Sequence, residues 1–309
     1  MADFVSHYLF GEQVLASCPT IVQLAAARRP AVFHWGLQGP DPLFFHKLAF
    51  GSPLHKLGNR MHSERTDQLF FALARAVNRM TGDSRAIAES YFYGFLCHYV
   101  LDSTLHPYVY CRQQECLEAD PKQSASAVHC QIESDIDYAL YDAEYHAPVT
   151  EFHPGDYYQL SDEETAVLAV LLHYLLQVVY EVDVDTAALR QSFGEMLTVQ
   201  NFLYSGNAAV MHGCRNLERL LRRGALLSSH LKGEAPAWNC LNLDHAPWHN
   251  LHHPDEIHTE SVPELLEQAA KKAVSLAGQY AAEFDAGWLL LHHFDNPFDN
   301  GNPKTLREK

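Results

Sequence analysis

The chain has 309 residues, of which 47% are apolar and 19% are charged, a composition that supports a well-filled core and excludes an extended disordered chain. Its formal net charge of −16, from 38 acidic and 22 basic side chains, repels polyphosphate backbones, so long nucleic acids are not expected as partners. The seven cysteines are odd in number and form no CxxC pair, so neither a disulfide framework nor a thiolate zinc site is indicated.

Helical patterns account for most of the chain. Helices are predicted over 14–29, 63–80, 83–105, 124–141, 161–182, 186–203, 207–228 and 261–292. Two of them begin with a capping box, Ser161 with Glu164 and Ser261 with Glu264. Pro107 predicts the end of the helix over 83–105.

Loops are predicted where glycine, proline and histidine gather. They cover 30–60, 142–160 and 231–260, and no alternating pattern predicts a β-hairpin. The last loop is rich in histidine and tryptophan, and surface histidine is the default interpretation of His252, His253 and His258. The alternative is a lid over a cleft, in which Trp248 offers its face to a lipid or a base.

The sequence predicts a cytoplasmic protein. Its first residues have neither the basic segment nor the apolar core of a signal peptide. The longest apolar run, over 166–180, is interrupted by His173 and Gln177 and is shorter than the roughly 20 residues of a spanning helix. We therefore expect no transmembrane segment, and the sequence leaves the oligomeric state open.

Imidazole and carboxylate side chains recur at intervals of four residues in two predicted helices. His98, Asp102 and His106 form one row, and His129 and Glu133 form another. A spacing of four turns a helix by about 400°, so these side chains stack on nearly the same face. Nitrogen and carboxylate oxygen are the ligands of Zn²⁺ in sites that keep a position open for water or substrate.

A single His–Asp pair at this spacing is often no more than a hydrogen-bonded pair in a helical core. Here His106 repeats the spacing after Asp102, and His129 with Glu133 repeats it on the next helix. The repetition favours a site for two or three metal ions over isolated pairs.

An N-terminal His7, Asp41 in a Gly-rich loop and His62 leading into a helix precede these two rows. This order resembles the zinc-dependent phospholipase C family, whose fold is shared by bacterial phospholipases C, single-strand-specific nucleases and glycosylphosphatidylinositol-specific phospholipase D. The resemblance covers roughly the first 140 residues. The spacing from His98 to His106 is closest to the glycosylphosphatidylinositol-specific branch.

The resemblance implies an all-α, multi-helix bundle with a buried multinuclear zinc cleft. We expect one mainly helical domain over 1–309, with the metal-site core in 1–150 and a C-terminal helical elaboration in 151–309. The later segments around Asn242, Trp248 and 296–301 resemble uncharacterised bacterial members of the same family.

The resemblance also implies a ligand set for two or three zinc ions. The first ion would take Asp41, His62, His98 and Asp102. The second would take His106, His129 and Glu133. The third would take His7, the other oxygen of Asp102, and the terminal amine and carbonyl of Ala2 after removal of the initiator methionine. Asp41 would also orient the nucleophile or act as general base.

Two assignments stay open. His55 and His62 both follow Asp41 at acceptable distances, and His62 is preferred because its segment leads directly into a helix. Asp137 extends the row of His129 and Glu133 by one turn, and we expect it to orient a ligand histidine or to be solvated rather than to bind metal.

The implied activity is zinc-dependent hydrolysis of a phosphodiester by a metal-bound hydroxide, with a phospholipid head group as the expected substrate. Two alternatives remain. One is a nuclease or nucleotidase of the same fold that acts on short substrates, and the other is a non-catalytic zinc-binding protein.

Overall fold

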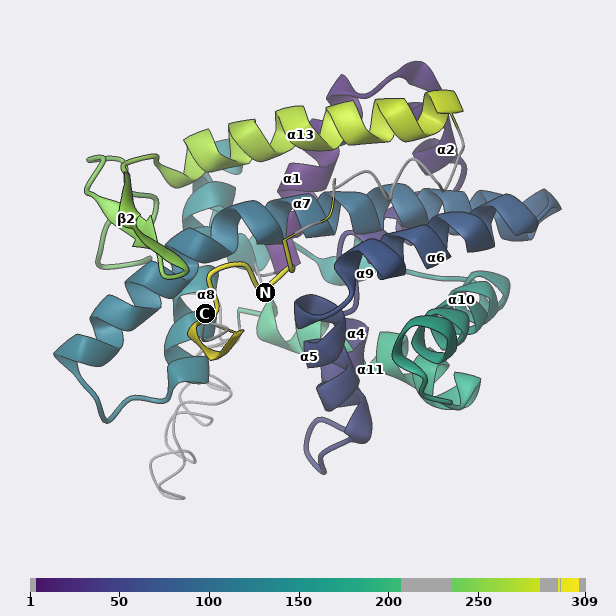
Figure 1. Ribbon diagram of the computed structural model, residues 1–309, viewed down its shortest axis with the longest axis horizontal. Helices are drawn as coiled ribbons and strands as arrows, with labels where there is room; N and C mark the ends of the chain where they lie inside the picture. The colour runs from purple at the N-terminus through teal and green to yellow at the C-terminus, as the bar shows by residue number, and fades with distance from the viewer. Residues whose placement is uncertain (1–3, 207–234, 284–293, 295, 306–309) are drawn as a thin grey trace.

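The computed structural model describes residues 4–206, 235–283, 294 and 296–305, and helices dominate this part of the chain (Figure 1). The helices are α1 (Phe4–Ser17), α2 (Thr20–Arg28), α3 (Pro30–Gly36), α4 (Pro42–Phe45), α5 (Pro53–Ser63), α6 (Thr66–Arg79), α7 (Gly82–Ala119), α8 (Ala125–Tyr145), η1 (Val149–Glu151), α9 (Pro154–Tyr157), α10 (Asp162–Tyr180), α11 (Thr186–Leu203), α13 (Val262–Glu283) and η4 (Pro303–Thr305). The strands are β1 (Trp248–Asn250) and β2 (His253–His258). The predicted all-α fold class is confirmed.

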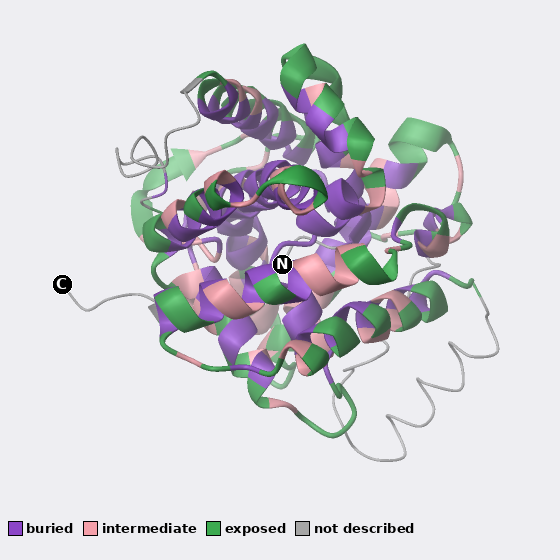
Figure 2. Cartoon of the chain, turned by 90° about the vertical axis from the view of Figure 1, so that its right-hand side faces the viewer, coloured by how far each residue is buried: buried purple, intermediate pink, exposed green. Residues whose placement is uncertain are grey.

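Helix α7 is the central helix of the fold. It packs against α1, α2, α3, α6, α8, α10, α13 and β1. Between Ile87 and Cys111 nearly every side chain of α7 is buried, so the helix has no solvent-facing stripe, as expected for a helix enclosed by others. Figure 2 shows the buried residues gathered on the inner faces of the surrounding helices.

The prediction that the helix ends at Pro107 is wrong, because α7 continues to Ala119. A proline inside a helix has no N–H for the carbonyl four residues before it, which here belongs to Ser103. The side-chain amide of Asn300 donates to that carbonyl at 3.1 Å and replaces the lost bond. A residue 197 positions away therefore allows the helix to pass through the proline.

Helices α3 and α7 cross at unusually close range. A Cβ atom on Gly36 would lie 2.4 Å from the carbonyl oxygen of Tyr91, and one on Gly94 would lie 2.2 Å from that of Phe33. Only residues without a side chain fit at this crossing. The contact places the residues that follow α3 directly against the middle of α7.

Several predicted boundaries differ from the structure. Pro19 separates α1 from α2, so the helix predicted over 14–29 is two helices. The segment predicted as a loop over 30–60 holds α3, α4 and α5, and the linker over 142–160 holds η1 and α9. Helices predicted over 207–228 and beyond Glu283 lie outside the described residues. Both predicted capping boxes form, with Ser161 and Ser261 each accepting from the backbone N–H of the glutamate three residues later.

No hairpin was predicted from the sequence, and this prediction is wrong, because the structure contains one. Strand β1 pairs antiparallel with β2, with Trp248 opposite His258. The Trp248 ring stacks on His258 at 4.6 Å and meets Tyr108 edge-on at 5.7 Å, so only 4% of the residue is exposed. This burial leaves Trp248 no open face for a lipid or a base.

Helix α10 is, by length and composition alone, long and apolar enough to cross a membrane. The core helices of soluble proteins meet the same criterion. Its leucines, among them Leu168, Leu172 and Leu176, are buried, and the helix packs against α6, α7 and α11.

Candidate metal centre

Three groups of buried imidazole and carboxylate side chains lie in the centre of the fold. Within each group the potential ligand atoms lie within 4.8 Å of one another. The groups are His7 with His98 and Asp102, Asp41 with His62 and His98, and His106 with His129 and Glu133. Helices α1, α5, α7 and α8, together with the loop before α4, supply these residues. The described residues therefore contain groups that could hold a metal ion.

Asp102 lies at the centre of the three groups. Its Oδ1 is 3.2 Å from His7 Nε2, and its Oδ2 is 3.2 Å from His98 Nε2. His62 Nε2 and His106 Nε2 both lie 3.9 Å from an Asp102 oxygen. One fully buried carboxylate thus faces histidines from three helices, the arrangement expected of a bridging ligand.

Four of the histidines are oriented by carbonyl oxygens at Nδ1. The acceptors are Leu37 O for His98, Gly58 O for His62, Phe298 O for His106 and Gln113 Oε1 for His129, at 2.7–3.1 Å. A carbonyl oxygen can only accept, so Nδ1 carries the proton in each ring. The Nε2 atoms are then the ones that face the carboxylates, as in histidines that bind metal through Nε2.

A hydrogen-bonded His–Asp pair does not account for this geometry at His98. Burial lowers the pKa of His98 well below its ordinary value, although the Asp102 charge opposes the shift. Burial therefore favours the neutral ring, whose Nε2 lone pair would face a carboxylate oxygen 3.2 Å away. Two acceptors at this distance repel each other unless a cation lies between them. Burial likewise lowers the pKa of His129, which lies 3.0 Å from Glu133.

The other pairs can share a proton. Burial lowers the pKa of His62, but Asp41 outweighs burial and raises it to about 9, with the two side chains 3.1 Å apart. Burial raises the pKa of Asp41. Burial alone would also raise the pKa of Asp102, but His106, His98 and His7 hold it well below its usual range. Burial would lower the pKa of His106, but Asp102 and Glu133 outweigh it and raise the pKa. His62 and His106 therefore favour the protonated form, and His98 and His129 favour the neutral form.

The structure separates the remaining predicted candidates. His62 lies in the centre, whereas His55 donates from Nε2 to the carbonyl of His46, outside the groups. Asp137 is not solvated but fully buried, and it contacts the start of α1. Ala2 lies outside the described residues.

The segment over 296–301 was singled out in the sequence only for its resemblance, and no residue of 296–305 was predicted to contact the centre. The Phe298 ring packs against His62 at 5.5 Å and His98 at 5.6 Å, and its carbonyl orients His106. Asp299 donates its backbone N–H to the carbonyl of His62, and its carboxylate lies 3.9 Å from His106 Nδ1. No spacing rule connects these residues with the centre, because they act largely through backbone atoms.

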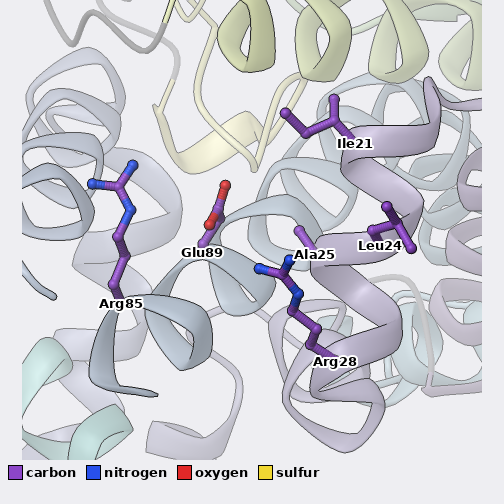
Figure 3. A pocket seen from close by; sticks show the side chains of 6 residues that line it. All are labelled: Ile21, Leu24, Ala25, Arg28, Arg85 and Glu89. Carbon is purple, nitrogen blue, oxygen red and sulfur yellow. The ribbon is translucent and has the colours of Figure 1, made fainter. Parts of the chain in front are cut away.

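A surface pocket elsewhere contains none of the predicted ligands. It lies between α2 and the first turns of α7, and Figure 3 shows its lining of Ile21, Leu24, Ala25, Arg28, Arg85 and Glu89. Ile21 and Leu24 are about half exposed, so the pocket is an open surface feature. The buried centre is the candidate functional site.

The chain matches no family model, no curated protein and no solved structure. The resemblance to the zinc-dependent phospholipase C family therefore rests on the motif residues alone. What the geometry itself supports is a set of buried groups able to hold a metal ion.

Proposed function

We propose that this chain is a zinc-dependent phosphodiester hydrolase of the phospholipase C type, with two or three zinc ions at the buried centre. The observation that carries the proposal is the orientation of the histidines. Carbonyl oxygens hold the Nδ1 protons of His62, His98, His106 and His129, so each Nε2 points at a buried carboxylate. Nitrogen and carboxylate ligands of this kind suit zinc.

The ligand set follows the three groups. Asp41, His62, His98 and Asp102 would hold one ion, His106, His129 and Glu133 a second, and His7 with Asp102 a third. Zinc bound there would supply Lewis-acid chemistry for attack on a phosphodiester. The terminal amine of Ala2 remains a predicted ligand of the third ion.

Asp41 is the candidate catalytic residue among the ligands. Burial raises the pKa of its carboxyl group, which favours acceptance of a proton near neutral pH. The neighbouring His62, 3.1 Å away, fixes the orientation of that carboxylate. Asp41 would orient the attacking water and accept its proton, and the leaving alcohol would take a proton from solvent.

The expected substrate is a phospholipid head group. The formal charge of −16 opposes the approach of a long polyanion. Short nucleic acids carry fewer phosphates and are not opposed to the same degree, so single-stranded oligonucleotides belong in the test.

The decisive experiment compares Asp102→Asn with Asp83→Asn. Both residues lie on α7, but Asp83 is on the surface, where its side chain is 72% exposed. Because Asp102 would be a ligand of two of the three ions, its replacement should remove those two zinc ions and lower phosphodiesterase activity by at least about 100-fold. Asp83→Asn should keep both properties. Zinc content comes from elemental analysis and activity from phosphatidylcholine, phosphatidylinositol and single-stranded DNA.

Full zinc content and activity in Asp102→Asn would contradict the ligand set. A wild-type protein that is fully loaded with zinc but cleaves no phosphodiester would instead be a non-catalytic zinc-binding protein. Cleavage of DNA without cleavage of lipids would assign the nuclease activity.

A further inference from the structure

Asp137 is a fully buried carboxylate that belongs to none of the three ligand groups. It lies on α8, one helical turn after Glu133. A buried charge is stable only when hydrogen bonds or opposite charges compensate the loss of water. The partners of Asp137 therefore indicate what the residue is for.

Those partners lie at the beginning of α1. The backbone N–H of Val5 donates to Oδ2 at 3.0 Å, and that of Ser6 donates to Oδ1 at 2.7 Å. The Ser6 hydroxyl also donates to Oδ1, and the Tyr204 hydroxyl donates to Oδ2 at 2.7 Å. Asp137 thus joins the first turn of α1 to α8 and to the end of α11.

These contacts fix the position and rotation of α1. The first N–H groups of a helix have no partner within the helix, and an acceptor that binds two of them behaves as a cap. The positive end of the helix dipole adds to this attraction for a carboxylate. Because the cap binds the backbone, it determines the direction in which the following side chain points.

The following side chain is His7. Unlike the other four histidines of the centre, His7 has no hydrogen-bond partner at Nδ1 among the described residues. Its ring stacks on His98 at 4.3 Å, and its Nε2 lies 3.2 Å from Asp102. Within the described part of the chain no carbonyl orients this ring, so its placement depends on the backbone of α1.

We propose that Asp137 is the positioning residue of His7 and thereby of the third metal site. Asp137 orients the His7 ring through the backbone of α1, whereas a carbonyl oxygen orients each of the other histidines by accepting directly from its ring. This inference rests on the proposed metal centre. It assigns to Asp137 a function that differs from ligation and from general stability.

The test is the zinc stoichiometry and affinity of Asp137→Asn. An amide can accept only through its oxygen, so one of the two N–H groups of α1 loses its acceptor. We expect one zinc fewer per chain than in the wild type, or a loss of about 10- to 100-fold in affinity for that zinc alone. Cobalt substitution would show the change as the loss of one set of d–d absorption bands.

Asp135→Asn is the matched control. Asp135 lies on the same helix, but it accepts from Trp238 Nε1 at 2.6 Å and from Gln131, and among the described residues its side chain has no hydrogen bond with α1. This variant should bind zinc as the wild type does. Thermal unfolding of both variants shows whether a loss of zinc reflects a general loss of stability.

A double-mutant cycle separates positioning from indirect damage. His7→Ala should lose the same zinc as Asp137→Asn, and the double variant should bind no less zinc than His7→Ala alone. Additive losses would overturn the inference. If Asp137→Asn does not fold, Ser6→Ala removes one donor to Asp137, and an unchanged affinity for the third zinc would overturn it equally.

The two proposals fail differently. A wild type that binds zinc, with an Asp137→Asn variant that binds equal zinc at equal affinity, overturns only the role of Asp137. A wild type that takes up no zinc overturns the metal centre and, with it, this inference.

Discussion

At the scale of single residues, the centre depends on which nitrogen of each histidine carries the proton. The spacing of four residues in the sequence predicted the imidazole and carboxylate side chains that meet. It could not predict the acceptors that orient them, because Leu37, Gly58 and Phe298 act through carbonyl oxygens that every residue possesses. Side-chain identity is readable from sequence, and backbone contacts between distant segments are not.

Gly39 offers a test of how tightly one of these rings is held. It has a φ of +50°, and a Cβ atom there would lie 2.3 Å from Cδ2 of His98. Gly39→Ala should therefore displace the His98 ring and weaken zinc binding by about 10- to 100-fold. Isothermal titration of the metal-free protein with zinc measures the change.

Gly51→Ala is the control for backbone strain. Gly51 has a φ of +79°, and its added Cβ would meet nothing within 4 Å. Both variants should lose about 1–2 kcal/mol of stability from the left-handed conformation, but only Gly39→Ala should lose zinc affinity. Equal affinities in the two variants would show that His98 does not need this fixed position.

At the scale of elements, α7 carries three of the predicted ligands on one continuous helix. Its interior was predictable from the apolar run and the four-residue spacing, but its end was not. Proline ends a helix when no other donor reaches the carbonyl four residues before it. Here Asn300 donates to the carbonyl of Ser103, and because it lies 197 residues away the sequence does not indicate this contact. The hairpin of β1 and β2 was also not predicted, because its turn residues, Leu251 and His252, include no glycine and so give no turn signal in the sequence.

The crossing of α3 and α7 predicts a large effect from a small change. In Gly94→Ala the new methyl group would meet the carbonyl oxygen of Phe33 at 2.2 Å, a backbone atom that cannot rotate away. We expect a loss of about 1–3 kcal/mol or more in the free energy of unfolding. The midpoint of urea unfolding measures it.

Gly194→Ala is the matched substitution at a helix position that no other element contacts. Gly194 lies on the exposed face of α11, and an added Cβ would meet nothing within 4 Å. Alanine should raise stability there by up to about 1 kcal/mol. Similar stabilities for the two variants would contradict the close crossing.

At the scale of the whole molecule, the described helices enclose a set of acidic groups that need positive charge. Ligands that bind only the folded state stabilise it by mass action. At a zinc concentration about 1,000 times the dissociation constant, each occupied site contributes about 4 kcal/mol. Removal of zinc with dipicolinate should therefore lower the melting temperature of the wild type, as measured by circular dichroism.

Asp102→Asn supplies the comparison for that experiment. Because the variant lacks the carboxylate that two of the three proposed ions share, chelation should lower its melting temperature less than that of the wild type. If the wild type melts at the same temperature with chelator and with added zinc, the centre is not a metal site. The cytoplasmic location, the single domain and the absence of a transmembrane segment remain predictions from sequence.

The contact between the Phe298 carbonyl and the ring of His106 joins residues 192 positions apart. On the ribosome, His106 emerges long before its acceptor has been translated. A nascent chain can therefore assemble its histidine and carboxylate rows early, but one ring stays free to rotate until Phe298 has been synthesised. Cation uptake by the finished centre should follow the emergence of Phe298 rather than precede it.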